Sequence, residues 1–262
     1  MERFELGTRS SDCAEHGSFE ESGHRIAMFK REFWSGCPVC AAEKVERERA
    51  EAAAAEARRA ADIREDAIGQ AAIPLRFRSR TFDAFTADTP EKQRALTVAR
   101  DYAEDFDNNL KTGRGLVFSG LPGTGKSHLA AAIALHLIDN HSRRWVQYTS
   151  CMGLIRAVRE TWRSDSDSSE RRVLNKFGRE IDLLMIDEVG VQYGTDSEQT
   201  ILFEILDRRY AEMRPTILLT NQGKDGLRKY VGERVYDRLI ETSRMVVFDW
   251  ESYRPQARRE QA

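Results

Sequence analysis

The feature that most constrains the fold of this chain is an octapeptide, Gly120-Leu121-Pro122-Gly123-Thr124-Gly125-Lys126-Ser127. It matches the phosphate-binding loop pattern in full, and it follows an apolar strand-like run and precedes a helical pattern. Glycines let backbone amides turn toward phosphates, and the following helix presents its positive end to them. The octapeptide and the adjoining His128 are therefore predicted to bind a nucleotide, with Lys126 at the β and γ phosphates and Ser127 on Mg²⁺. An incidental tight turn is the alternative, and the flanking strand and helix argue against it.

The second half of the chain has the pattern of a parallel sheet. From Ile73 onward, short β-branched runs alternate with helical patterns, which is typical of an α/β fold with helices flanking the sheet. Two of the runs, Leu183–Ile186 and Ile217–Leu219, are apolar throughout and are expected in the middle of the sheet. The five predicted strands are Gly115–Ser119, Trp145–Thr149, Leu183–Asp187, Thr216–Thr220 and Met245–Phe248.

Polar side chains at two strand ends supply candidate catalytic groups. Asp187 and Glu188 follow a buried strand, at the end where such sheets place their ligands. Asp187 is the candidate to hold hydrated Mg²⁺, and Glu188 to orient and deprotonate the attacking water. Asn221 follows the next strand, where its amide can bond the water or the γ phosphate. The alternatives are an acidic turn for the first pair and an ordinary turn residue for Asn221.

The N-terminal region carries a candidate metal site. Cys13-x-x-His16 and Cys37-x-x-Cys40 form two pairs separated by twenty residues, close to the spacing of structural zinc sites. Because cytosolic thiols stay reduced, these residues favour tetrahedral Zn²⁺ over disulfides. Exposed thiols beside a stray histidine are the alternative interpretation.

Neighbouring residues refine this prediction. Gly36 and Pro38 flank Cys37 and suit a tight turn, while His24 is a rival ligand without a partner at the same spacing. Phe29, Phe33 and Trp34 are expected to form a small core rather than an interface. The site should be structural, and metal binding should supply much of the folding energy.

Composition divides the chain into segments. A region rich in Ala, Glu and Arg, about Glu43 to Gly69, favours a solvated helix with pairs such as Glu43 and Arg47. The predicted organisation is a loop-rich zinc module at 1–42, a charged helical linker at 43–72, a large α/β domain at 73–256 and a disordered tail at 257–262.

Charge and hydropathy restrict the partners. The net charge of −2 provides no global attraction for nucleic acid, so any DNA contact needs a local patch. Five arginines flank a predicted mobile loop, Ser164–Glu170, and either form such a patch or a solvated helix face, given the acidic residues among them: Arg156, Arg159, Arg163, Arg171 and Arg172. No apolar run approaches the length of a membrane span, and the N-terminus lacks a secretory signal, so a cytoplasmic location without membrane contact is expected.

Taken together, Lys126, Asp187-Glu188 and Asn221 resemble the Walker A, Walker B and sensor 1 elements of an AAA+ ATPase. The C-terminal runs Gly232–Leu239 and Phe248–Arg254 resemble the ending of DnaC/DnaI-type helicase loaders and their IstB-type relatives. Ile73–Arg78, followed by Thr81-Phe82, resembles the start of the ATPase domain in that family. The resemblance covers about Ile73 to Arg254.

The resemblance implies an ATPase that assembles with its own copies into a ring or spiral, with ATP and Mg²⁺ at subunit junctions. Arg238 matches the family's arginine finger, and Arg234 is a second candidate; a pair of surface arginines is the plain alternative. The few residues after Arg238 leave no room for the helical C-terminal lid of other AAA+ proteins, which this family also lacks. In loaders of this kind the N-terminal domain grips a hexameric replicative helicase, which implies that role for the zinc module.

Three functions remain open on these grounds. The first is a loader that places the helicase on single-stranded DNA. The second is an IstB-type transposition regulator that binds duplex DNA, and the third is a nucleotide-gated protein adaptor without DNA contact. The zinc module favours the loader.

Overall fold

The computed structural model describes residues 3–26, 31–141, 144–163, 169–191 and 195–253, and the chain forms two compact units that meet between Ile63 and Arg64. The predicted tail at 257–262 lies outside the described residues, as does most of the loop predicted at Ser164–Glu170. The elements are β1 (Arg3–Cys13), β2 (Gly17–Ile26), β3 (Glu32–Trp34), α1 (Pro38–Gln70), η1 (Leu75–Phe77), α2 (Pro90–Glu104), α3 (Phe106–Thr112), β4 (Gly115–Gly120), α4 (Lys126–Asn140), β5 (Val146–Ser150), α5 (Cys151–Glu160), α6 (Glu170–Asn175), η2 (Lys176–Glu180), β6 (Leu183–Val189), α7 (Asp196–Ala211), β7 (Thr216–Thr220), α8 (Lys224–Val231), α9 (Glu233–Thr242) and β8 (Ser243–Phe248).

The N-terminal unit contains more regular structure than its glycine-punctuated sequence suggests. β1 and β2 form a long antiparallel hairpin in which Cys13 pairs with Gly17, and β3 adds a third strand. Its strands are largely polar and lack the alternation of apolar and polar residues that marks a half-buried strand. No apolar side chain is buried among the described residues of this unit, so another source of stability is needed.

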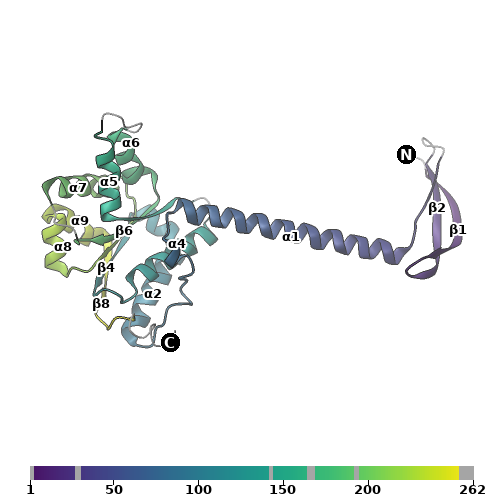
Figure 1. Ribbon diagram of the computed structural model, residues 1–262, viewed down its shortest axis with the longest axis horizontal. Coiled ribbons are helices and arrows are strands. Elements are labelled where there is room, and N and C mark those ends of the chain that lie inside the picture. The colour runs from purple at the N-terminus through teal and green to yellow at the C-terminus, as the bar shows by residue number, and fades with distance from the viewer. Residues whose placement is uncertain (1–2, 27–30, 142–143, 164–168, 192–194, 254–262) are drawn as a thin grey trace. The chain divides into compact units, whose positions relative to one another are not determined.

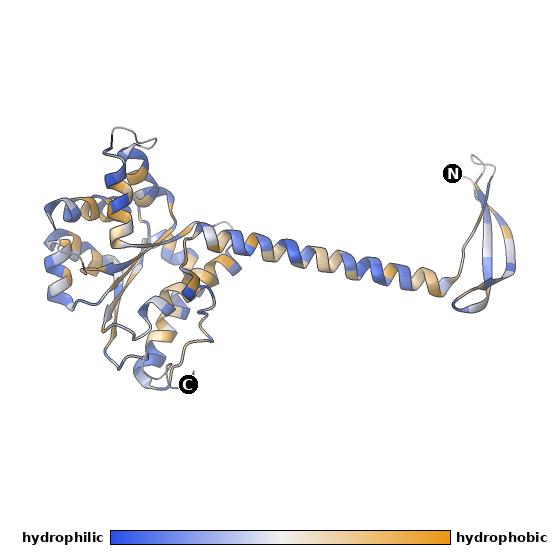
Figure 2. Cartoon of the chain, viewed as in Figure 1, coloured by the Kyte–Doolittle hydropathy of each residue, from blue (hydrophilic) through white to orange (hydrophobic). Residues whose placement is uncertain are grey.

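Helix α1 begins at Pro38, several residues before the predicted helix start. Proline suits the first turn of a helix because its missing N–H would have no partner there. Blue alternates with pale tan along the helix, as its charged and alanine residues require (Figure 2), and Ile68 is its one buried residue. The helical ion pair is Lys44 with Glu48, 3.8 Å apart, rather than the predicted Glu43 and Arg47. None of the described helices is long and apolar enough to cross a membrane.

The C-terminal unit is built on a five-stranded parallel sheet in the order β5-β6-β7-β4-β8. This confirms the predicted α/β fold, and the two all-apolar runs form the inner strands β6 and β7. Helices α2 and α4 cover one face, and α5, α7, α8 and α9 cover the other (Figure 1). Alternate strand residues face the two layers: Leu116 and Phe118 pack toward α2 and α4, and Val117 packs toward the opposite layer.

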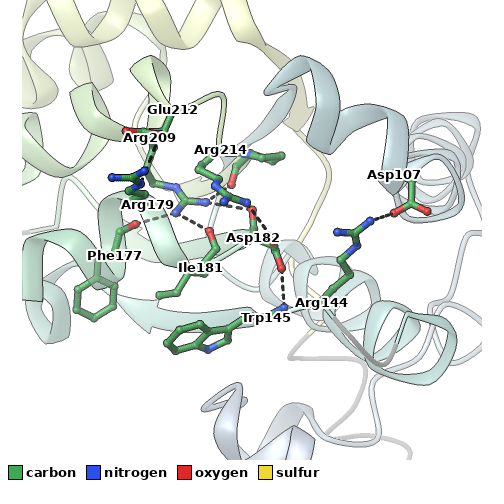
Figure 3. Close-up of polar contacts among 11 residues, drawn as sticks. Asp107, Arg144, Trp145, Phe177, Arg179, Ile181, Asp182, Arg209, Glu212 and Arg214 are labelled. Carbon is green, nitrogen blue, oxygen red and sulfur yellow. Dashed lines mark hydrogen bonds and ion pairs between the residues drawn. The ribbon is translucent and has the colours of Figure 1, made fainter.

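A fully buried arginine closes the edge of the sheet at which β6 and β7 begin. Arg209 of α7 is 1% exposed, and its guanidinium donates to Thr216 Oγ1 and to the carbonyls of Phe177, Ile181, Asp182 and Pro215 at 2.6–3.3 Å. Figure 3 shows the bonds to Phe177 and Ile181 beside the Arg214–Asp182 ion pair, whose N–O distance is 2.7 Å. Burial lowers the pKa of Arg209 to about 9, which leaves it protonated at neutral pH. One side chain therefore supplies donors to carbonyls at the start of the sheet, including those of Phe177 and Ile181, which precede β6.

Candidate nucleotide-binding site

The predicted nucleotide residues meet at one edge of the sheet. Parallel strands end on the same side, so β4 delivers Gly120, β6 delivers Asp187, and β7 delivers Asn221 to this edge. Asn221 is exposed at the tip of β7. This edge is formed by the C-terminal ends of the strands, and it lies opposite the N-terminal ends, where Arg209 is buried.

Glycines are required where the phosphate loop bends. Gly123 and Gly125 have φ of 80° and 98°, which side chains with a Cβ rarely adopt. A Cβ on Gly120 would lie 2.1 Å from the Phe248 carbonyl oxygen, and one on Gly125 would lie 2.6 Å from the Phe85 ring. The loop is thus enclosed by its neighbours at both ends.

Lys126 is buried, at 6% exposure, and its side chain folds back along the loop. Its Nζ donates to the carbonyl oxygens of Gly120 and Leu121 at 2.6 and 2.7 Å. Thr124 also donates, from Oγ1, to the Leu121 carbonyl at 2.8 Å. The ammonium group is therefore held within the turn that the loop encloses.

Ser127 and Asp187 are brought into direct contact although sixty residues separate them. Ser127 Oγ donates to Asp187 Oδ2 at 2.8 Å, which joins the two predicted magnesium ligands. The Tyr148 hydroxyl donates to the same oxygen, and the Glu188 amide donates to Oδ1 at 2.7 Å. The sequence analysis did not identify Tyr148, because it lies within an otherwise ordinary strand run. The one signal that could have pointed to it is its hydroxyl group, near the end of a predicted strand.

Glu188 has a backbone conformation that is uncommon for a side chain of its size. Its φ is 59°, and it sits where the β6–β7 register shifts between Ile186 and Val189. The buried Thr220 supports this bulge by donating from Oγ1 to the Val189 carbonyl at 2.7 Å. The bulge turns Glu188 outward, and its side chain is exposed.

His128 lies on the side of the loop that faces the segment before α2. Its Nε2 is 2.8 Å from the Thr81 carbonyl oxygen, and its ring meets Phe85 edge-on with centroids 5.3 Å apart. Burial lowers the pKa of His128. The segment around Thr81-Phe82, which resembles the start of the family's ATPase domain, therefore packs against the loop.

Both arginine-finger candidates lie on α9 and contact the same carboxylate of α7. Arg238 forms an ion pair with Asp207 and stacks on Tyr210, and Arg234 approaches Asp207 at 3.7 Å. The Arg234 side chain is 67% exposed and the Arg238 side chain 24%. Arg234 is therefore the more accessible of the two.

The five arginines near the predicted loop are unequal. Arg159 is held by the buried Glu198 at 3.6 Å, whereas the other four are exposed: Arg156, Arg163, Arg171 and Arg172. Trp162, at the end of α5, is 53% exposed, and its indole donates to Glu170 at 2.9 Å. An exposed aromatic ring among arginines was not part of the sequence prediction.

The four predicted zinc ligands converge in the N-terminal unit. Their ligand atoms all lie within 4.8 Å of one another. His16 Nδ1 is 3.7, 3.8 and 3.2 Å from the sulfurs of Cys13, Cys37 and Cys40, and the Cys13 and Cys40 sulfurs are 3.4 Å apart. A tetrahedral zinc ion with Zn–S bonds of about 2.3 Å places its sulfurs about 3.8 Å apart, so the cluster fits it.

Without a metal, the clustered ligand groups share their protons: Cys13 is shifted toward the thiolate, whereas His16 and Cys40 are shifted toward their protonated forms. A backbone hydrogen bond with Glu15 and the His16 ring lower the pKa of Cys13 to about 6, and the bond to Cys13 raises the pKa of His16 to about 8. The hydrogen bond to Cys13 raises the pKa of Cys40 to about 12. His16 Nε2 lies 3.2 Å from Glu43 Oε1, so this carboxylate orients the ring.

The remaining N-terminal predictions can be located as well. His24 lies on β2, stacked on Phe33 with centroids 5.7 Å apart and outside the cluster. Trp34 packs over Gly23, whereas Phe33 is 37% exposed. Phe29 lies outside the described residues. Gly36 has a φ of 65°, as the predicted turn before Cys37 requires.

A glycine-rich phosphate loop, a serine bonded to an aspartate at the next strand end, and a parallel five-stranded sheet define an ATP-binding protein of the AAA+ class. Comparisons with known proteins identify its family. The family model for the IstB-like ATP binding protein matches residues 51–261. The chain belongs to this family, and it is an ATPase by class.

Individual relatives agree with this assignment. The replicative helicase loader DnaC of Escherichia coli (strain K12) is 39% identical over 175 residues, 66% of this chain and 69% of the relative. The DnaC of Buchnera aphidicola subsp. Baizongia pistaciae (strain Bp) is 34% identical over 188 residues, 71% and 74% of the two chains. The resemblance inferred from the motifs is therefore confirmed.

Solved structures share the fold. A crystal structure of the DnaC helicase loader aligns with a TM-score of 0.59 at 24% identity, covering 66% of this chain and 98% of that one. AMPPCP-bound DnaA from Aquifex aeolicus aligns with a TM-score of 0.56 at 20% identity, covering 72% and 55%.

Proposed function

We propose that this protein is an ATP-dependent replication factor that binds a hexameric replicative helicase and loads it onto single-stranded DNA. One observation carries the proposal: the phosphate loop and the Asp187 carboxylate are joined through Ser127 in a chain that is 39% identical to the DnaC loader over 175 residues. A module at 1–42 binds the partner, 43–72 links it, and 73–256 is the ATPase domain.

In this proposal the loop amides and Lys126 bind the phosphates of ATP, and Ser127 and Asp187 hold Mg²⁺. When bound, magnesium neutralises charge on the β and γ phosphates. Glu188 orients the attacking water and accepts its proton. The bulge, which leaves the Glu188 side chain exposed, supports this role. Asn221 donates to the water or the γ phosphate from the tip of β7.

Hydrolysis is completed by a neighbouring copy. Arg238, with Arg234 as the second candidate, stabilises charge on the phosphoryl group of the adjacent subunit in a ring or spiral. Both arginines contact Asp207 within their own chain, so insertion requires exchange of one anionic partner for another. A single subunit receives no arginine from a neighbour, so its hydrolysis is slow and depends on assembly.

The N-terminal module grips the helicase, and Cys13, His16, Cys37 and Cys40 hold Zn²⁺ within it. Zinc supplies a cross-link between the β1–β2 hairpin tip and the start of α1. Because no apolar side chain is buried among the described residues of this unit, its folding depends on that cross-link.

Single-stranded DNA contacts α5 and α6. The four exposed arginines around these helices attract the backbone, and Trp162 offers a surface on which a base stacks. Stacking on an exposed indole requires unpaired bases, which favours single strands over duplex.

DNA binding separates this proposal from its rivals. Fluorescence anisotropy is measured with labelled single-stranded and duplex oligonucleotides, with ATP, with ADP and without nucleotide. ATP-dependent preference for single strands, together with co-purification of a hexameric helicase, supports the loader. Preference for duplex DNA indicates a transposition regulator, and no DNA binding in any state indicates a protein adaptor.

A further inference from the structure

Residues 248–253, at the end of β8 and beyond it, lie directly against the phosphate loop and are called the tail in this section, as distinct from the tail predicted at 257–262. The Trp250 indole Nε1 donates to the Thr124 carbonyl at 3.0 Å, and the Tyr253 backbone amide donates to the Gly123 carbonyl at 3.0 Å. These donors belong to the run Phe248–Arg254, which resembles the ending of the helicase-loader family. The proposed ATP and DNA chemistry gives this run no role.

The carbonyl groups of the loop have a nearly complete set of partners. Lys126 Nζ binds the carbonyls of Gly120 and Leu121, and the α4 helix binds that of Gly125 through the Leu129 amide at 3.0 Å. The carbonyls of Gly123 and Thr124 lie between these two groups. Within the part of the chain that the structure describes, their donors are the Tyr253 amide and the Trp250 indole, both beyond β8.

Because of peptide geometry, the hydrogen bonds to the Gly123 and Thr124 carbonyls also fix the orientation of two amide groups of the loop. A trans peptide group is planar, so its N–H points away from its C=O. The Gly123 carbonyl shares a peptide with the Thr124 amide, and the Thr124 carbonyl shares one with the Gly125 amide. Fixing the two carbonyls on the tail side therefore directs the two amides to the opposite side, where phosphates bind.

These peptides need external support because glycine flanks both of them. Gly123 and Gly125 can rotate through conformations that other residues avoid, so an unsupported loop would sample many amide orientations. A nucleotide would then have to order the loop on binding, at a cost in affinity.

The tail is itself anchored to the strand that carries the loop. The Phe248 ring is fully buried between Phe118 of β4 and Trp250, with centroid distances of 5.1 and 4.9 Å. The Phe248 carbonyl accepts from the Leu121 amide at 3.3 Å. The donors of the tail are thus held at a defined distance from the end of β4.

We infer that Trp250 and the backbone of Tyr253 are positioning groups that hold the Thr124 and Gly125 amides toward the phosphates. The inference rests on the proposed nucleotide site and adds to it how the loop is ordered. Neither group touches the nucleotide.

The indole contribution is tested with Trp250→Phe, which keeps an aromatic ring against Phe248 and removes the N–H. Loss of one hydrogen bond should weaken ADP and ATP binding about three- to tenfold in calorimetry. Trp145→Phe, which removes an indole near the opposite edge of the sheet, should leave both affinities unchanged. A lowered melting temperature with unchanged affinity for ADP and ATP would mean packing alone and overturns the inference for Trp250.

The backbone contribution is tested by comparing Tyr253→Pro with Tyr253→Ala, because both remove the side chain and only proline removes the N–H. The proline variant should bind ADP several-fold more weakly than the alanine variant. Equal affinities in this pair overturn the inference for Tyr253. A wild-type chain that binds neither ADP nor ATP overturns the proposed function together with the inference, whereas wild-type binding with unchanged variants overturns the inference alone.

Discussion

The hydroxyl of Tyr148 donates a hydrogen bond to Oδ2 of Asp187, the same oxygen that accepts from Ser127. Burial raises the pKa of Tyr148, so the hydroxyl stays protonated and acts as a donor throughout the neutral range. The Tyr148 amide also donates to the Ala71 carbonyl at 2.7 Å, just after α1. Strand β5, next to β6, thus orients the Asp187 carboxylate and is hydrogen-bonded to Ala71 at the end of the linker region.

Tyr148→Phe should raise the Mg²⁺ concentration needed for ATP binding. The variant keeps the buried ring but removes a donor that holds the Asp187 carboxylate in one rotamer, and one lost hydrogen bond corresponds to about three- to tenfold. A magnesium titration at fixed ATP measures the midpoint. Tyr102→Phe loses a comparable hydroxyl bond, to the Arg114 carbonyl, and should not move it; an unmoved midpoint in Tyr148→Phe would count against the positioning role.

Lys126→Ala should lower ATP affinity by at least about tenfold, because the ammonium charge and its donors to the phosphates are lost. Calorimetric titration with ATP gives the affinity, and thermal unfolding without nucleotide checks that the fold is intact. Lys111→Ala removes an exposed lysine from α3 and serves as the control. Full retention of ATP binding and hydrolysis by Lys126→Ala would refute the site.

Arg238→Ala should keep ATP binding while lowering assembly-dependent hydrolysis by at least about tenfold, since a finger acts on the neighbour's phosphate. Mixing Arg238→Ala with Lys126→Ala should restore part of the phosphate release, because mixed junctions pair an intact loop with an intact finger. Arg234→Ala, tested alongside, identifies which arginine inserts. If mixing restores nothing while subunits exchange, the trans role is lost.

Glu43→Gln should weaken zinc binding about 10- to 100-fold, the range for loss of a carboxylate that orients a ligating histidine. Competition with a chromogenic chelator measures the zinc affinity of the full chain. Glu46→Gln changes an exposed carboxylate one turn further along α1 and should have no effect. Wild-type protein that purifies without zinc, and takes up none when it is supplied, would contradict the metal assignment.

Arg209→Met should lower the free energy of unfolding by about 3 kcal/mol or more, because it removes the buried donors to the carbonyls of Phe177 and Ile181. Urea denaturation of the full chain measures this difference. Arg179→Met removes an exposed arginine 3.7 Å from Glu212 and should change stability by less than about 0.5 kcal/mol. Similar losses in both variants would argue against the role assigned to the buried guanidinium.

The sheet was predictable because its strands are short apolar runs bounded by turn residues, and all five lie where the pattern placed them. The N-terminal hairpin was not, because β1 and β2 are mostly polar and bury almost nothing, so no period marks them. The helix start at Pro38 was also missed, since Cys37 and Cys40 suggested a loop up to Ala42. The pair of cysteines instead spans the first turn of α1.

The amino-acid sequence alone determined the class of fold and singled out the groups proposed to bind phosphate and magnesium, because glycine spacing, strand patterning and strand-end carboxylates are local properties of the chain. Only the tertiary structure decided that Tyr148 holds Asp187, that Trp250 and Tyr253 hold the loop, and that Asp207 contacts both arginines. Each of these contacts joins residues far apart in sequence. Strand order and helix packing create them, and no local pattern records which distant side chain arrives.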